Sequence, residues 1–167
     1  MKAIHWIIAA LACAQPAQAA VNDPEIVIYR FPGVFDSGGA DNVGAATVFF
    51  CTNFGGVLEN VRIVTRQSNA TIANNVVFGV SHLTTLIAVT HPTFAYSDQG
   101  PSNMATGFVQ GTAAIAATSI NIICTAMTID ATTVAPVGTA LRGVRFNPIP
   151  GESGIGHGVG EAASRGS

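Results

Sequence analysis

Charged residues are scarce in this sequence, and lysine is almost absent. Asp, Glu, Lys and Arg together make up 10% of the 167 residues, against about 25% in an ordinary globular domain. The one Lys is Lys2, and the six Arg residues form no cluster. A nucleic-acid partner requires a basic stripe that replaces phosphate counterions, and anionic lipids attract basic segments. The composition therefore argues against nucleic acid and against an anionic membrane surface as partners.

The low charge also shapes the expected surface, which must be largely neutral and rich in hydroxyl and amide groups. Such a surface lacks the charge repulsion that keeps protein molecules apart. The composition therefore favours self-association or adhesion to an extracellular or envelope partner. Codon bias in a GC-rich genome explains the lack of Lys equally well, and this alternative stays open.

Motifs for catalysis or for a cofactor are missing as well. The nearest approach to a serine-hydrolase motif, around Ser153, departs from the G-x-S-x-G spacing. The histidines beyond the N-terminal segment, His82, His91 and His157, have no spacing that would aim two of them at one zinc ion. We expect His91, which precedes Pro92, to mark the end of a strand.

Two acidic residues, Glu59 and Asp98, are expected in turns with solvated side chains. Catalytic carboxylate pairs meet only in the folded chain, so their spacing in the sequence does not exclude them. We expect a non-catalytic binding module without a cofactor. The alternative is a secreted hydrolase whose active-site residues are dispersed along the sequence.

The N-terminus has the layout of a secretory signal peptide. One positive charge precedes an apolar stretch over residues 3–14, Pro16 follows, and Ala17 and Ala19 supply the small side chains that signal peptidase requires. Residues 1–19 are therefore predicted to be cleaved, which makes the mature protein secreted or periplasmic. The apolar stretch is shorter than the roughly 20 residues of a spanning helix. No transmembrane segment is expected after cleavage.

The three cysteines divide between this leader and the mature chain. Cys13 follows a loose lipobox, and a lipid anchor on Cys13 is the alternative to a soluble exported product. Cys51 and Cys124 each follow two large apolar residues and precede Thr, as mid-strand core positions do. An exported chain meets an oxidising compartment, so a Cys51–Cys124 disulfide is predicted, either between two sheets or within one.

Short segments rich in Val, Ile, Thr and Phe recur along the mature chain, separated by clusters of Gly, Pro, Asn, Asp and Ser. This pattern predicts strands, and windows with a helical stripe are absent. The Pro32-Gly33 pair is expected to interrupt the first strand, and Asn74-Asn75 to mark a turn or bulge. The predicted strands are Glu25–Phe31, Gly44–Asn53, Val61–Gln67, Ile72–Val80, Leu83–His91, Gly107–Ala117, Ser119–Asp130 and Thr139–Phe146.

Seven or eight strands with a long-range cysteine pair predict an all-β fold, a two-sheet β-sandwich of immunoglobulin-like architecture with one disulfide. The mature chain has no Trp to pack on the bridge, which excludes the antibody-type subclass. Residues 20–147 are the expected β-sandwich domain. Residues 148–167 are rich in Gly and Pro and are predicted to form a flexible C-terminal tail.

One loop offers oxygen ligands for a metal ion. Asp36, Asp41 and Asn42 place two carboxylates and one amide oxygen on a Gly-rich turn, and calcium prefers such ligands. The loop lacks the EF-hand pattern, and Asx turns account for the same residues. These three residues are the candidate calcium site, with Asx turns as the alternative interpretation.

Overall fold

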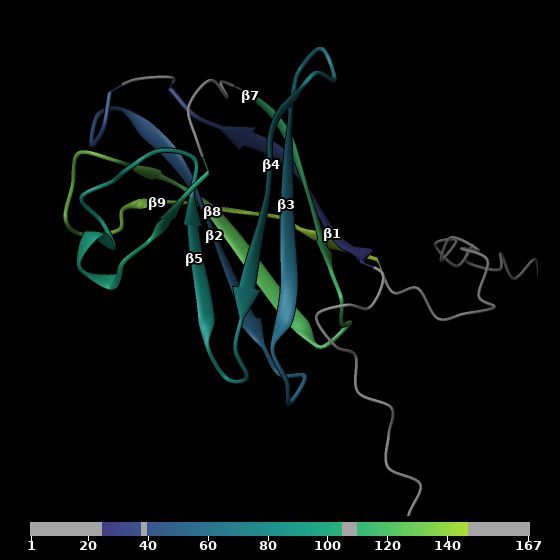
Figure 1. The fold of residues 1–167 in the computed structure, drawn as a ribbon. Helices are drawn as coiled ribbons and strands as arrows, with labels where there is room; N and C mark the ends of the chain where they lie inside the picture. The colour runs from purple at the N-terminus through teal and green to yellow at the C-terminus, as the bar shows by residue number, and fades with distance from the viewer. Residues whose placement is uncertain (1–24, 38–39, 105–109, 147–167) are drawn as a thin grey trace, which may run out of the picture.

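The computed structural model describes residues 25–37, 40–104 and 110–146 (Figure 1). The predicted signal peptide (residues 1–19), Cys13 and the predicted tail (residues 148–167) lie outside the described residues. Within the described residues, no helix is long and apolar enough to cross a membrane.

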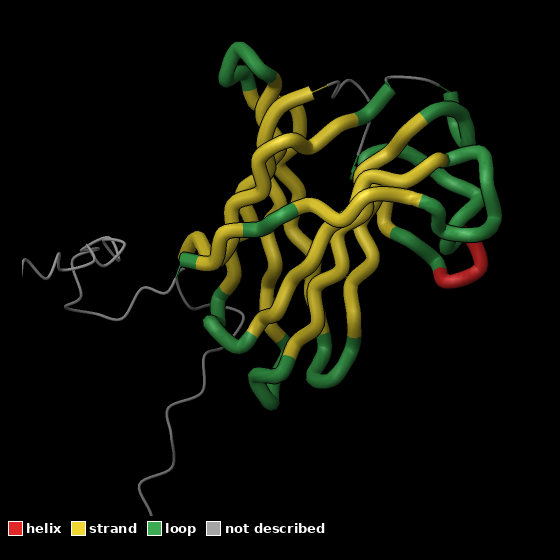
Figure 2. The backbone as a smooth tube through the Cα atoms, turned by 180° about the vertical axis from the view of Figure 1, so that it is seen from behind, coloured by secondary structure: helices red, strands yellow, loops and turns green. Residues whose placement is uncertain are grey.

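The described chain forms two five-stranded sheets packed as a β-sandwich, which confirms the predicted fold class. One sheet has the order β10-β1-β7-β3-β4 and the other β6-β5-β2-β8-β9. From behind, the strands lie in two layers with loops gathered at their ends (Figure 2). The strands are β1 Ile26–Phe35, β2 Ala45–Asn53, β3 Glu59–Gln67, β4 Ile72–Val80, β5 Thr85–Val89, β6 Ser102–Asn103, β7 Gln110–Ala117, β8 Ile122–Asp130, β9 Gly138–Leu141 and β10 Val144–Arg145, with a 3₁₀ turn η1 at Ser97–Gln99.

The alternation of side chains in β3 shows how the sequence builds the sandwich. Val61, Ile63 and Thr65 are buried, while Arg66 on the opposite face is exposed. This in-and-out pattern is the one predicted for a strand with one face in water. β2, apolar on both faces, is paired on both sides by β5 and β8, as expected for a central strand.

Two predictions about strand ends were wrong. The first strand does not end at Phe31: the β1–β7 register is irregular between Pro32 and Val34, at the predicted interruption, but β1 continues to Phe35. The segment Thr139–Phe146 is not one strand: β9 pairs with β8 in one sheet, whereas β10 pairs with β1 in the other. The chain crosses between the sheets at Arg142-Gly143, and there is no room for a side chain at Gly143 beside the Phe31 ring.

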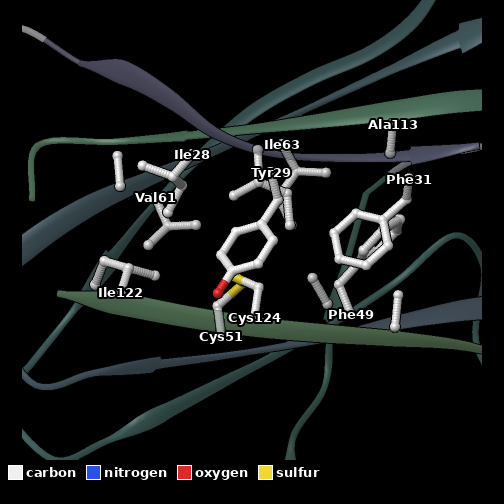
Figure 3. Close-up of a cluster of buried hydrophobic side chains, with 14 of the residues drawn as sticks. Ile28, Tyr29, Phe31, Phe49, Cys51, Val61, Ile63, Ala113, Ile122 and Cys124 are labelled. Atoms are coloured by element: carbon white, nitrogen blue, oxygen red, sulfur yellow. A yellow bond between two sulfur atoms is a disulfide. The ribbon is translucent and has the colours of Figure 1, made fainter. Parts of the chain in front are cut away.

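Aromatic rings join the two sheets in the core, which also contains the disulfide (Figure 3). The rings of Phe31 in β1 and Phe49 in β2 meet edge to face, with centroids 5.7 Å apart. Cys51 and Cys124 are bonded and lie directly opposite each other on β2 and β8, with Cα atoms 4.2 Å apart. The bridge therefore lies within one sheet, unlike the inter-sheet bridge of antibody domains.

Candidate functional site

The three residues of the candidate calcium loop, Asp36, Asp41 and Asn42, have different surroundings in the structure. Asp36 is buried, and its Oδ2 lies 2.7 Å from Nδ1 of His91. Asp41 is exposed, and the backbone N–H of Asn42 donates to the carbonyl of Pro92. Among the described residues, no group of three or more His, Cys, Asp or Glu could hold a metal ion. Calcium binding by this loop therefore stays a prediction.

The His91 ring has acceptors on both sides. Its Nδ1 meets the Asp36 carboxylate, and its Nε2 lies 3.1 Å from the carbonyl oxygen of Val43. A ring that carries both protons donates to both acceptors. His91 follows the end of β5, close to the strand end that the sequence predicts. It also connects the end of β1 to the loop before β2.

Glu59 is the second buried carboxylate, and its prediction as a solvated turn residue was wrong. It is the first residue of β3 and is 0% exposed. The hydroxyl of Thr118 donates to its Oε2, and the backbone N–H of Asn60 donates to the same hydroxyl. Its Oε1 has no hydrogen-bond partner among the described residues. Asp98, by contrast, is exposed in η1 as expected.

Asn53 and Ser119 have side-chain oxygens that face Gly55, as does the unpartnered oxygen of Glu59. The amide group of Asn53 donates to the carbonyls of Val57 and Val80, both at 2.7 Å, and its Oδ1 accepts from the N–H of Gly55. These bonds fix the direction of Oδ1. A Cβ placed on Gly55 would lie 2.9 Å from Glu59 Oε1, 3.1 Å from Asn53 Oδ1 and 3.4 Å from Ser119 Oγ. Three side-chain oxygens therefore converge beside Gly55.

The edge strand β4 is a second candidate site, because it leaves one side of its sheet open. β4 lies at one edge of its sheet, paired only with β3 among the described strands. It is nine residues long and contains no charged residue and no proline. The other three edge strands, β6, β9 and β10, have two, four and two residues. Of the four described edge strands, β4 is therefore the longest.

The inward side chains along this edge are incompletely covered. Val76 and Phe78 of β4 and Leu86 of β5 pack on the core but stay partly exposed. A crevice of about 200 Å³ lies between the end of β4 and β5. Its lining comprises Gly79, Val80, Thr84, Thr85, Leu86, Ile87, Gln99, Gly100 and Ser102.

A second crevice, of about 320 Å³, lies beside β1, β7 and β10. The guanidinium of Arg30 lies 5.5 Å from the centroid of the Phe146 ring at this crevice. The lining comprises Arg30, Phe31, Pro32, Thr112, Ala113, Val144 and Phe146. Neither of these two crevices is lined by a carboxylate or a histidine.

Sequence reasoning missed both buried acids, and for one of them a signal was present. Glu59 precedes Val61 and Ile63 at intervals of two, which places it on the inward face of the same strand. The contact of Asp36 with His91 joins residues 55 positions apart and leaves no periodic trace in the sequence.

Comparison of the chain with protein-family models, with curated proteins and with solved structures finds no match in any of the three.

Proposed function

We propose that this protein is an exported, non-catalytic binding module of a cell surface or matrix, and that it associates by strand addition along β4. The observation that carries the proposal is the nine-residue outer edge of β4, which no described strand pairs and no charge or proline blunts. Natural sheets usually protect such edges with Lys, Pro or short strands. An edge without these devices is suited to receive a strand from another chain.

The partly exposed core side chains beside β4 also favour a partner that adds a strand along this edge. A strand added outside β4 would extend the sheet over Val76 and Phe78, which now lie at its margin. Burial of apolar surface stabilises association by roughly 25 cal/mol per Å² before the loss of freedom on association is subtracted. Backbone hydrogen bonds along β4 and burial of the apolar side chains at the sheet margin would therefore both stabilise the association.

A second copy of the chain is the partner we favour. β4 carries no charge, so two β4 strands can lie side by side without like-charge repulsion. The low charge of the whole sequence acts in the same direction. An extracellular or envelope protein with an exposed extended segment is the alternative partner.

Export is the other part of the proposal. The leader-like N-terminus supports it, and the Cys51–Cys124 bridge fits an oxidising compartment outside the cytoplasm. Intact mass of the native protein tests both processing routes. A chain that begins at Ala20 supports cleavage after residue 19, a lipidated Cys13 at the N-terminus indicates an anchored lipoprotein, and a retained leader contradicts both.

Strand addition is tested by sedimentation velocity over a range of protein concentrations. Val77→Lys places a charge on the exposed face of β4 and should reduce or abolish the concentration-dependent larger species. Val64→Lys is the matched control, because Val64 lies in β3 with its backbone paired by β4 on one side and β7 on the other. Equal loss of association in both variants would argue against the β4 edge, and a monomer at every concentration would argue against self-association.

A further inference from the structure

The buried polar cluster at one end of the sandwich has the character of an ion site. It gathers Asn53 from the end of β2, Glu59 from the start of β3 and Ser119 from the turn after β7. All three are buried, with exposed fractions of 0%, 0% and 6%. Their side-chain oxygens all face Gly55, each 2.9 to 3.4 Å from the position that a Cβ on Gly55 would take.

The unpartnered Oε1 of Glu59 favours a cation as the ligand of this cluster. Glu59 forms no ion pair and receives one hydrogen bond, on Oε2, among the described residues. A carboxylate removed from water is normally paired with a cation or bound to a metal ion, because its lost hydration is otherwise uncompensated. Oε1 faces Gly55, as do Asn53 Oδ1 and Ser119 Oγ, and no basic side chain meets Oε1 in the described structure.

We propose that Glu59, Asn53 and Ser119 bind a single calcium ion. Carboxylate, amide and hydroxyl oxygens are hard ligands of the kind that calcium takes, and calcium completes its shell with backbone carbonyls or water. One carboxylate provides little charge, so the expected dissociation constant is that of weak extracellular sites, about 10⁻³ M. The ion joins the β2–β3 loop to the β7–β8 turn. The site is separate from the Asp36, Asp41 and Asn42 loop.

Thermal unfolding of the disulfide-intact protein tests the site with calcium itself as the probe. Calcium that binds only the folded state raises Tm by mass action. At about 10 mM CaCl₂, roughly ten times the expected dissociation constant, Tm should rise by about 4 °C relative to the protein in chelator. The same concentration of MgCl₂ should have a smaller effect, because magnesium requires a tighter octahedral shell. No rise in Tm with CaCl₂ would overturn the proposal.

Two variants separate this site from any other calcium site on the chain. Glu59→Gln removes the charge with little change of shape, whereas Gly55→Ala keeps the charge but places a Cβ 2.9 Å from Glu59 Oε1, which must shift away from the other two oxygens. Each should abolish the rise in Tm, and the Gly55→Ala result decides the matter if Glu59→Gln does not fold. The control is Asp41→Asn in the exposed loop, which should keep the full rise. A rise that persists in Gly55→Ala, or that is lost only in Asp41→Asn, would show that calcium binds elsewhere.

Discussion

Asp36 and His91 are joined by a 2.7 Å hydrogen bond between Oδ2 and Nδ1, although 55 positions separate them in the sequence. The exposed fractions of the two side chains are 4% and 3%, so water does not solvate either group. The pair connects the end of β1 to the segment that follows β5, which belongs to the other sheet. It is therefore an inter-sheet connection within the sandwich.

Removal of one member of this pair should destabilise the fold strongly. His91→Ala removes the buried ring that meets both the Asp36 carboxylate and the Val43 carbonyl oxygen, and such changes lower the free energy of unfolding by about 3 kcal/mol or more. Asp41→Asn, on the exposed part of the same loop, should change it by less than about 0.5 kcal/mol. Urea unfolding of both variants measures the difference. Equal stability of the two variants would mean that the Asp36–His91 contact contributes nothing.

The Cys51–Cys124 bridge should supply a large part of the stability. It closes a loop with a sequence separation of 73 residues, and in the chain-entropy model such a loop contributes about 4 kcal/mol by restricting the unfolded chain. Urea unfolding with and without reductant should show a loss of about this size. A loss below about 1 kcal/mol would indicate that the pairing of β2 with β8 is already retained in the reduced unfolded chain.

Residue 111 must be glycine because the backbone of the neighbouring strand β3 comes very close to it. A Cβ at this residue would lie 1.9 Å from the carbonyl oxygen of Arg66, in the neighbouring strand. Backbone of a central strand does not move aside, so Gly111→Ala should destabilise the protein by about 3 kcal/mol. Gly79→Ala is the control, because the nearest atom to its Cβ would be Leu58 Cδ1 at 3.6 Å. Thermal unfolding should show a large decrease of Tm for the first variant only.

The pKa of Asp130 is lowered from its ordinary value, mainly by the hydrogen bond from the Thr132 hydroxyl and then by the Thr132 backbone N–H. A carboxyl with a lowered folded-state pKa stabilises the fold above its unfolded pKa, about 3.9, and loses this effect as pH falls through the folded value. Thr132→Val removes the hydroxyl donor and keeps the N–H, so the pKa should rise part of the way back.

Carbon-detected NMR titration of the Asp130 carboxyl measures this pKa. Thr133→Val is the matched control, because the Thr133 hydroxyl donates to the backbone carbonyl of Asp130 and not to its carboxylate. An equal change of pKa in both variants would contradict the assignment to Thr132.

Long strands such as β3 were predictable from the sequence because their signal is local. Val61 and Ile63 alternate with outward residues, and this period of two suffices to locate β3 and its buried face. The end of the first strand was misjudged because pairing with β7 continues past the irregularity at Pro32-Gly33.

The candidate sites were less predictable because they depend on contacts between distant segments. Glu59 could have been placed on the inward face by the spacing of β3, but its neighbours Asn53, Thr118 and Ser119 come from two other parts of the chain. The open edge at β4 likewise follows from strand order, which local alternation does not determine.

Pairing of β4 between copies of the chain is tested most directly by hydrogen–deuterium exchange of residues 72–80 in dilute and in concentrated protein. Among the described residues no strand pairs with the outward amides of β4, so these amides should exchange rapidly in an isolated molecule, whereas an added strand protects them. We expect the protection of β4 to increase with concentration while that of the central strand β3 stays constant. Exchange of β4 that is the same in dilute and concentrated protein would contradict self-association through this edge.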